Sequence, residues 1–125
     1  MLSKLEVASM LPARDLQRAR TFYKDMLGLE PAEETSADLT YQTPAGARFG
    51  IYETDNAGTA KNTALCWETP DIVAETAELR GRGVVFEEYD LPGLKTEHGV
   101  ATMDTVKAAW FTDSEGNILC LSERR

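Results

Sequence analysis

A chain of 125 residues is long enough for one domain with its own hydrophobic core. Hydrophobic residues make up 42% of it and charged residues 27%, and no apolar run approaches the roughly 18 residues that a membrane-spanning helix needs. The formal net charge of −8 disfavours binding to nucleic acid or to an anionic membrane surface. It is compatible with a cationic ligand, or simply with a well-solvated acidic surface.

The N-terminal segment Met1–Val7 lacks the long apolar stretch and the small-residue cleavage site of a secretory signal peptide, so a cytoplasmic location is expected. The chain has two cysteines, Cys66 and Cys120. A small secreted domain held together by disulfides usually carries more. In a reducing compartment we therefore expect two buried thiols rather than a disulfide. The two thiols could lie near each other, if the strands at Thr63–Thr69 and Ile118–Ser122 pair as the first and last strands of one module.

The first half of the chain predicts a strand, a helix and three more strands. The segment Leu5–Ala13 is typical of a strand, and Asp15 follows it as a helix N-cap. Apolar residues then recur at helical spacing until Gly28, which suits the left-handed position that ends a helix. These apolar residues are Leu16, Ala19, Phe22, Tyr23, Met26 and Leu27. The strands expected next are Pro31–Thr35, Leu39–Thr43 and Arg48–Glu53.

The second half predicts the same order of elements after a polar linker at residues 54–62. A strand is expected at Thr63–Thr69 and a helix N-cap at Asp71, with Gly83 as the end of the helix. The inner face of this helix is indicated by Ile72, Thr76 and Leu79. The later strands expected are Val84–Tyr89, Val106–Thr112 and Ile118–Ser122, with a hairpin turn at Asp113–Asn117.

The two halves therefore repeat one supersecondary unit, because the spacing between Asp15 and Asp71 almost equals that between Gly28 and Gly83. The second copy is longer. Its additional residues are best assigned to an inserted loop at residues 90–104, which contains His98, the only histidine. Such a loop is either a functional lid or a tolerated surface excursion.

Two motifs resemble the vicinal oxygen chelate superfamily of glyoxalases, extradiol dioxygenases, fosfomycin-resistance enzymes and bleomycin-binding proteins. The first comprises Arg14-Asp15-Leu16, Phe22-Tyr23 and Leu27-Gly28-Leu29, and the second is Ala109–Asn117. The resemblance covers essentially the whole chain. It implies a single α+β domain of two tandem βαβββ modules, at residues 3–53 and 63–123. Their sheets would form a curved, mostly antiparallel sheet around one cavity.

In metal-using members of that family, four side chains from four strands hold a divalent ion. The resemblance maps these positions onto Ala8, Gly50, Ala64 and Cys120. Alanine and glycine have no side-chain ligand atom, and one cysteine does not make a site for the hard or borderline ions of this family. No metal and no cofactor are therefore expected. A relocated site remains an alternative, because Glu6 shares a strand face with Ala8, and Glu68 shares one with Ala64.

Side-chain alternation predicts which residues line the cavity. Aromatic and small residues with a few carboxylates would suit a flat apolar or cationic molecule. The expected ligand-binding residues are Met10, Tyr52, Cys66, Glu68, His98, Trp110 and Cys120, with Ile118, Ala8 and Ala64 beside them. The residues expected to pack beneath the helices are Leu11, Phe49, Ile51, Leu65, Trp67, Phe111, Leu119 and Leu121. The alternative is that the aromatic side chains fill the cavity as core.

These observations favour a metal-independent binding protein that sequesters a small aromatic or cationic compound and forms a homodimer, as bleomycin-binding relatives do. An alternative is a lyase, isomerase or dioxygenase that uses a relocated metal or a carboxylate or histidine base. A third class is an interaction module with a filled cavity.

Overall fold

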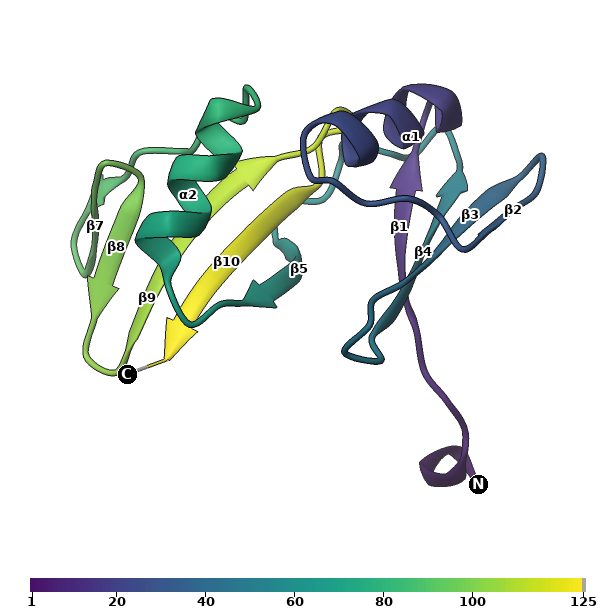
Figure 1. Ribbon diagram of the computed structural model, residues 1–125, viewed down its shortest axis with the longest axis horizontal. Helices are drawn as coiled ribbons and strands as arrows, with labels where there is room; N and C mark the ends of the chain where they lie inside the picture. The colour runs from purple at the N-terminus through teal and green to yellow at the C-terminus, as the bar shows by residue number, and fades with distance from the viewer. Residues whose placement is uncertain (125) are drawn as a thin grey trace.

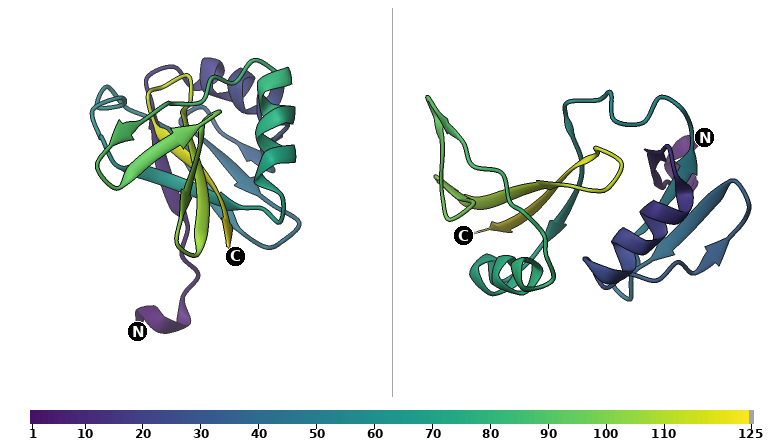
Figure 2. Two further views of the ribbon diagram at one scale, coloured as in Figure 1. Left: turned by 90° about the vertical axis from the view of Figure 1, so that its left-hand side faces the viewer. Right: turned by 90° about the horizontal axis from the view of Figure 1, so that it is seen from above.

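The computed structural model describes residues 1–124 and contains two β-sheets, each with one α-helix on one of its faces (Figures 1 and 2). We call residues 1–53 the N-terminal half and residues 63–124 the C-terminal half. The α+β class and the tandem arrangement expected from the sequence are confirmed. Within the described part of the chain, no helix combines the length and the apolar character needed to cross a membrane.

The N-terminal half forms a four-stranded sheet in the order β1-β4-β3-β2. Its elements are β1 (Ser9–Ala13), α1 (Leu16–Asp25), β2 (Glu33–Glu34), β3 (Asp38–Gln42) and β4 (Arg48–Glu53). Strand β1 pairs with β4 in parallel, and the other pairs are antiparallel. The Asp15 carboxylate accepts a hydrogen bond from the Arg18 N–H at 3.0 Å, as expected of an N-cap. Gly28 has a φ of 71°, which confirms its role after the helix.

The C-terminal half forms a six-stranded sheet in the order β5-β10-β9-β8-β7-β6. Its elements are β5 (Thr63–Glu68), α2 (Ile72–Gly81), β6 (Asp90–Leu91), β7 (Leu94–Glu97), β8 (Val100–Met103), β9 (Val106–Thr112) and β10 (Ile118–Arg124). The Asp71 carboxylate caps α2 through the Ala74 N–H at 3.0 Å. The predicted hairpin turn is confirmed, with Gly116 at a φ of 87° and the Asp113 N–H donating to the Asn117 carbonyl.

Two of the predicted strands differ from the structure. The first strand begins at Ser9 rather than Leu5, and Leu2–Lys4 form a short 3-10 turn instead. The strand expected at Val84–Tyr89 is wrong, because this segment makes only the isolated bridge Phe86↔Phe111. The segment cannot form a long ladder with β9, because β8 already pairs with the first residues of that strand, for example through Ala101↔Ala108.

Residues 90–104 also differ from the expected loop, because they contain the short strands β6, β7 and β8 (Figure 1). Strands β7 and β8 are joined by a two-residue turn in which His98 has a φ of 53° and Gly99 a φ of 78°. Two successive positive φ values are characteristic of the type I′ turn that closes a β-hairpin. The usual sequence signal for that turn is Asn-Gly or Asp-Gly. The turn here is His98-Gly99, which lacks this signal, so the sequence did not predict the hairpin.

Each sheet has one helix-covered face and one face without a helix, which we call the open face. Alternation along the strands separates the two sets of side chains. The residues expected beneath the helices all belong to one hydrophobic cluster: Leu11, Phe49, Ile51, Phe111, Leu119 and Leu121 are buried, and Leu65 and Trp67 pack against them. The Phe49 and Trp67 rings meet edge to face, 6.2 Å between centroids, which joins the two halves.

The linker between the halves passes directly over the last hairpin. Gly58 has a φ of 84° and Gly116 a φ of 87°. A Cβ atom on Gly116 would lie 3.0 Å from the Gly58 Cα atom, which is closer than ordinary contact. Both positions therefore require glycine, for conformation and for space.

Two neighbouring tyrosines in the core differ in how their hydroxyls are satisfied, which predicts opposite effects of removing them. The rings of Tyr23 and Tyr41 lie 5.6 Å apart. The Tyr23 hydroxyl donates to Asp113 Oδ2 at 2.7 Å, whereas the Tyr41 hydroxyl is buried without a partner within residues 1–124. Burial raises the pKa of Tyr41 to about 12.

We expect Tyr41→Phe to raise the free energy of unfolding by about 1 kcal/mol and Tyr23→Phe to lower it by about 1–2 kcal/mol. Urea denaturation of the two variants checks this, and a loss of stability in both would contradict it.

Candidate functional site

The open face of the first sheet carries two of the expected ligand-binding residues, Met10 and Tyr52. Met10 is 52% exposed and Tyr52 is 41% exposed, which is unusual for large apolar side chains on a sheet. Met10 lies opposite Gly50 in the ladder. A Cβ atom at Gly50 would be 2.8 Å from Met10 Sδ and Cε, so the glycine allows the Met10 side chain to lie flat across the strand.

The open face of the second sheet brings three other expected residues into one row. Cys120 is the ladder partner of Cys66 on one side and of Trp110 on the other. The Trp110 indole N–H donates to Thr63 Oγ1 at 3.2 Å, and its ring meets Tyr89 edge to face at 5.8 Å. Trp110 is half-buried, so one part of an aromatic surface remains available on this face.

The two thiols are adjacent, as expected, but they are not equally buried. Cys120 is buried, whereas Cys66 is exposed and has Sγ 3.5 Å from Ser122 Oγ. Burial, together with the hydrogen bond and charge of neighbouring Cys66, raises the pKa of Cys120 to about 12. Cys120 is therefore a protonated thiol near neutral pH, which is a poor nucleophile.

Glu68 and His98 lie apart from this row. Glu68 ends β5 and forms an ion pair with Arg124 at 3.0 Å. His98 is exposed in the turn between β7 and β8, and its carbonyl accepts a hydrogen bond from Arg80. Strand β7 is separated from β10 by β8 and β9, so the structure does not bring His98 together with Cys120.

The donor set at the family's metal positions does not fit a metal ion. Ala8, Gly50 and Ala64 provide no side-chain ligand atom, and the Cys120 thiol stands alone among them. The two carboxylates considered for a relocated site each face an arginine instead, Glu6 with Arg48 at 3.4 Å and Glu68 with Arg124. Within residues 1–124, no three His, Cys, Asp or Glu side chains gather at one point.

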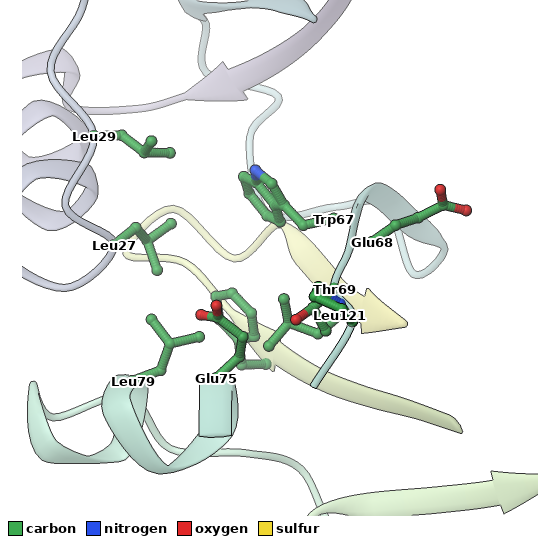
Figure 3. Close-up of a pocket in the computed structure, with 10 residues that line it drawn as sticks. Leu27, Leu29, Trp67, Glu68, Thr69, Glu75, Leu79 and Leu121 are labelled. Atoms are coloured by element: carbon green, nitrogen blue, oxygen red, sulfur yellow. The ribbon is translucent and has the colours of Figure 1, made fainter. Parts of the chain in front are cut away.

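A pocket of about 240 Å³ lies on the opposite, helix-covered side, between the two halves (Figure 3). We call it the seam pocket. Leu27 and Leu29 line it from the segment after α1, and Leu79 and Glu75 line it from α2. No local sequence pattern indicates this pocket. The sequence predicts Leu27, Leu79 and Trp67 as core residues, and a carboxylate at Glu75, in the first turn of α2, is favoured by the helix dipole alone.

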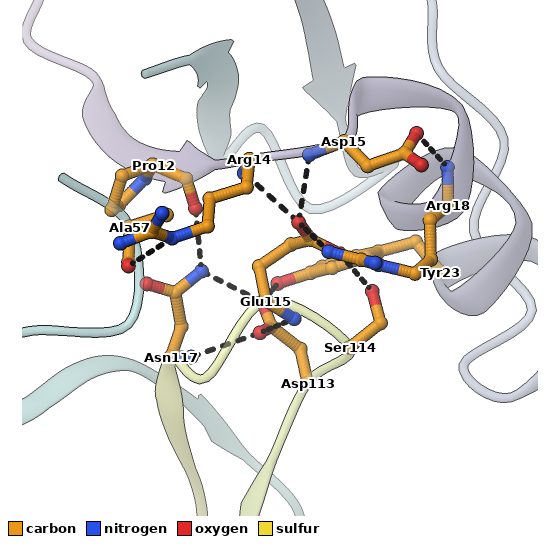
Figure 4. Close-up of polar contacts among 10 residues, drawn as sticks. All are labelled: Pro12, Arg14, Asp15, Arg18, Tyr23, Ala57, Asp113, Ser114, Glu115 and Asn117. Carbon is orange, nitrogen blue, oxygen red and sulfur yellow. Dashed lines mark hydrogen bonds and ion pairs between the residues drawn. The ribbon is translucent and has the colours of Figure 1, made fainter. Parts of the chain in front are cut away.

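A buried carboxylate, Glu115, fixes the last hairpin to the start of α1 (Figure 4). Its Oε1 accepts the N–H groups of Arg14 at 2.9 Å and Asp15 at 3.0 Å. The Arg18 guanidinium donates to both carboxylate oxygens, and the Ser114 hydroxyl donates to Oε2. The Glu115 side chain is fully shielded from solvent, whereas that of Arg18 is 53% exposed. We call these five residues the Glu115 cluster.

The hydrogen bonds of the cluster control the protonation of Glu115. Burial of the carboxyl group raises its pKa, but the hydrogen bonds from Arg18, Asp15 and Ser114 and the positive charge of Arg18 outweigh burial and lower the pKa to about 2. Glu115 is therefore ionised over the physiological range. Beside the cluster, the Asn117 amide donates to the Pro12 carbonyl at 3.0 Å, which adds a further link between the hairpin and the first half.

The fold is shared with proteins of known structure at low sequence identity. A bleomycin-binding protein complexed with bleomycin is 15% identical with a TM-score of 0.69, and the match covers 98% of this chain and 100% of the other. The fosfomycin resistance protein FosX from Listeria monocytogenes, complexed with Mn(II) and sulfate, is 16% identical with a TM-score of 0.71, covering 100% and 93%. A glyoxalase/bleomycin resistance protein/dioxygenase from Alicyclobacillus acidocaldarius is 18% identical with a TM-score of 0.68, covering 97% and 92%.

A search of curated proteins found no match. A family model, in contrast, matches residues 6–121, which is nearly the whole chain and includes both open faces and the Glu115 cluster. The chain belongs to the Glyoxalase/Bleomycin resistance protein/Dioxygenase superfamily.

Proposed function

We propose that this protein binds a small aromatic or cationic molecule without a metal ion, on the open faces of its sheets. One observation carries the proposal. Three of the positions at which metal-using members of the family hold their ion are occupied here by Ala8, Gly50 and Ala64, whose side chains cannot bind a metal. The same open faces present Tyr52, which is exposed, and Trp110, which is half-buried. Flat ring systems stack on such side chains, and a positive charge is attracted by their π-faces and by the acidic surface of a chain with a net charge of −8.

The binding site in this proposal is completed by a second copy of the chain. Tyr52 and Trp110 belong to separate sheets, and Met10 and Tyr52 expose apolar surface that soluble monomers seldom leave uncovered. A two-fold axis would place the open face of the N-terminal half of one copy opposite the open face of the C-terminal half of the other, producing two equal cavities. The same proposal places the protein in the cytoplasm, where both thiols would stay reduced.

The solved bleomycin-binding protein complexed with bleomycin supports this ligand class, since the two chains have the same fold over almost their entire lengths. We therefore take bleomycin as the first probe and N-methylacridinium as a smaller aromatic cation. The enzymatic alternative would require either a metal ion or a positioned base. The Cys120 thiol and the distant His98 do not provide one.

Binding is tested by tryptophan fluorescence in the presence of EDTA. In the variant Trp67→Phe, Trp110 is the remaining tryptophan and reports on the open face of the second sheet. We expect saturable quenching by at least one aromatic cation, because stacking brings the ligand into contact with the indole. The matched variant Trp110→Phe should lack this signal. Absence of saturable quenching across the panel, or binding that appears only after a divalent ion is added, would overturn the proposal.

A further inference from the structure

The seam pocket has apolar walls contributed by both halves of the chain (Figure 3). Leu27 and Leu29 face Leu79 across it, and Leu121 and the Trp67 ring lie on the side of the second sheet. Leu27, Leu29, Trp67 and Leu79 are only partly buried, so they form walls that the packing of the two halves does not close. A molecule in this pocket would replace water along apolar surface on several sides.

One carboxylate points into this apolar space. Glu75 lies on the first turn of α2, with its oxygens close to the apolar side chains of the pocket (Figure 3). Within residues 1–124 it takes part in no ion pair. Glu68 also borders the pocket, but its carboxylate is turned outward and pairs with Arg124. Among residues 1–124, no lysine or arginine lines the pocket, so the described lining is negative in character.

We propose that the seam pocket binds a small organic cation with an apolar body, such as an arylalkylammonium ion, with the ammonium group against Glu75. The apolar body would contact Trp67 and the leucines. A pocket of about 240 Å³ is slightly below the range of roughly 300–1,000 Å³ that is usual for drug-sized ligands. It is thus matched to a molecule with one ring rather than to a large antibiotic.

This site is separate from the proposed open-face site. Trp67 and Trp110 lie on opposite faces of the second sheet, because Trp67 pairs with Leu121 and packs on the core, whereas Trp110 is in the row of Cys120 and Cys66. The two tryptophans can therefore report on the two sites individually. The seam ligand would also touch both halves of one chain, so its binding would favour their native arrangement and raise the midpoint of thermal unfolding.

The experiment uses 2-phenylethylammonium as the probe, with neutral 2-phenylethanol and anionic 3-phenylpropionate as isosteric comparisons. Binding is followed by Trp67 fluorescence in the Trp110→Phe variant, and by the shift of the Trp67 indole N–H signal in a ¹⁵N-correlated NMR spectrum of the unmodified protein. We expect saturable binding in the order cation, alcohol, anion. Glu75 is an exposed residue, and an ion pair with an exposed carboxylate contributes at most about 1 kcal/mol. The cation should therefore bind about fivefold more tightly than the alcohol.

Two substitutions on α2 make the test specific. Glu75→Gln should bring the affinity for 2-phenylethylammonium down to that for 2-phenylethanol and leave the affinity for the alcohol unchanged. Glu78→Gln is the matched control, because Glu78 lies on the same helix and pairs with Arg82 at 3.3 Å instead of facing the pocket. Equal affinities for cation and alcohol in the unmodified protein, no binding of either, or an equal effect of both substitutions would each overturn the proposal. None of these outcomes bears on quenching of Trp110, so failure here is distinguishable from failure of the open-face site.

Discussion

Replacing Glu115 with glutamine is expected to lower the free energy of unfolding by about 2–4 kcal/mol, because the change removes one acceptor from a buried set of hydrogen bonds. Glutamine keeps the shape of the side chain but has one acceptor oxygen in place of two. The N–H groups of Arg14 and Asp15 and the guanidinium of Arg18 would compete for it. The new NH₂ group would take the place of Oε2 and face the Arg18 Nε–H, so that two donors would point at each other. Urea denaturation followed by circular dichroism measures the loss.

The same substitution should change the pH dependence of stability. The pKa of Glu115 is about 2 in the folded protein and near 4.5 in the unfolded chain. Unfolding therefore takes up a proton below pH 4.5. The stabilisation by the ionised carboxylate is fully present above that pH and is lost progressively as the pH falls toward 2. Glu115→Gln should show a flatter decline in stability between pH 4.5 and pH 2 than the unmodified protein.

Glu78→Gln is the matched control for both measurements, because Glu78 forms an exposed ion pair with Arg82. Such pairs contribute little, and we expect a change below about 0.5 kcal/mol. If Glu115→Gln unfolded at the same urea concentration as the control, the Glu115 cluster would not hold the halves together as described.

The second large effect concerns association of two chains. Met10→Glu is expected to convert a dimer into a monomer, because it places an additional carboxylate at the centre of the proposed interface of a chain with a net charge of −8. Burying an unpaired charge costs about 3–5 kcal/mol, which corresponds to a rise in the dissociation constant of more than about 100-fold. Sedimentation velocity at several protein concentrations measures this change.

Val73→Glu is a suitable control, because Val73 is also an exposed apolar residue, at 65%, but lies on α2 rather than on an open face. We expect this variant to remain a dimer. A Met10→Glu protein with the same sedimentation coefficient as the Val73→Glu protein would argue against an interface on the open face.

Most of the features that could be predicted from the sequence come from the repeat of one structural unit and from the alternation of side chains along its strands. The paired caps Asp15 and Asp71 and the glycines Gly28 and Gly83 are local signals, and each has the expected role. The proximity of Cys120 to Cys66 followed from the pairing of the first and last strands of a βαβββ unit, which the structure shows to be parallel. Features such as these depend on residues close in sequence or on a regular ladder.

The remaining features depend on contacts between segments far apart in the chain. Glu115 looks like an ordinary turn residue in Asp113–Asn117, and only the fold brings it to the N-terminus of α1. The seam pocket arises from incomplete packing between Leu27 and Leu79, which no local pattern encodes. The hairpin around His98 was missed for a different reason, because its turn lacks the common Asn-Gly signal.

The position of the Glu115 cluster has a consequence for the order in which the newly made protein acquires its structure. Arg14 and Asp15 obtain their acceptor from a residue about one hundred positions later, and the linker glycine Gly58 rests on the same hairpin. During synthesis, the start of α1 and the linker cannot acquire these contacts until the hairpin at Asp113–Asn117 has been made. The first half can form its own sheet earlier, but it reaches its final position only after this later hairpin has formed.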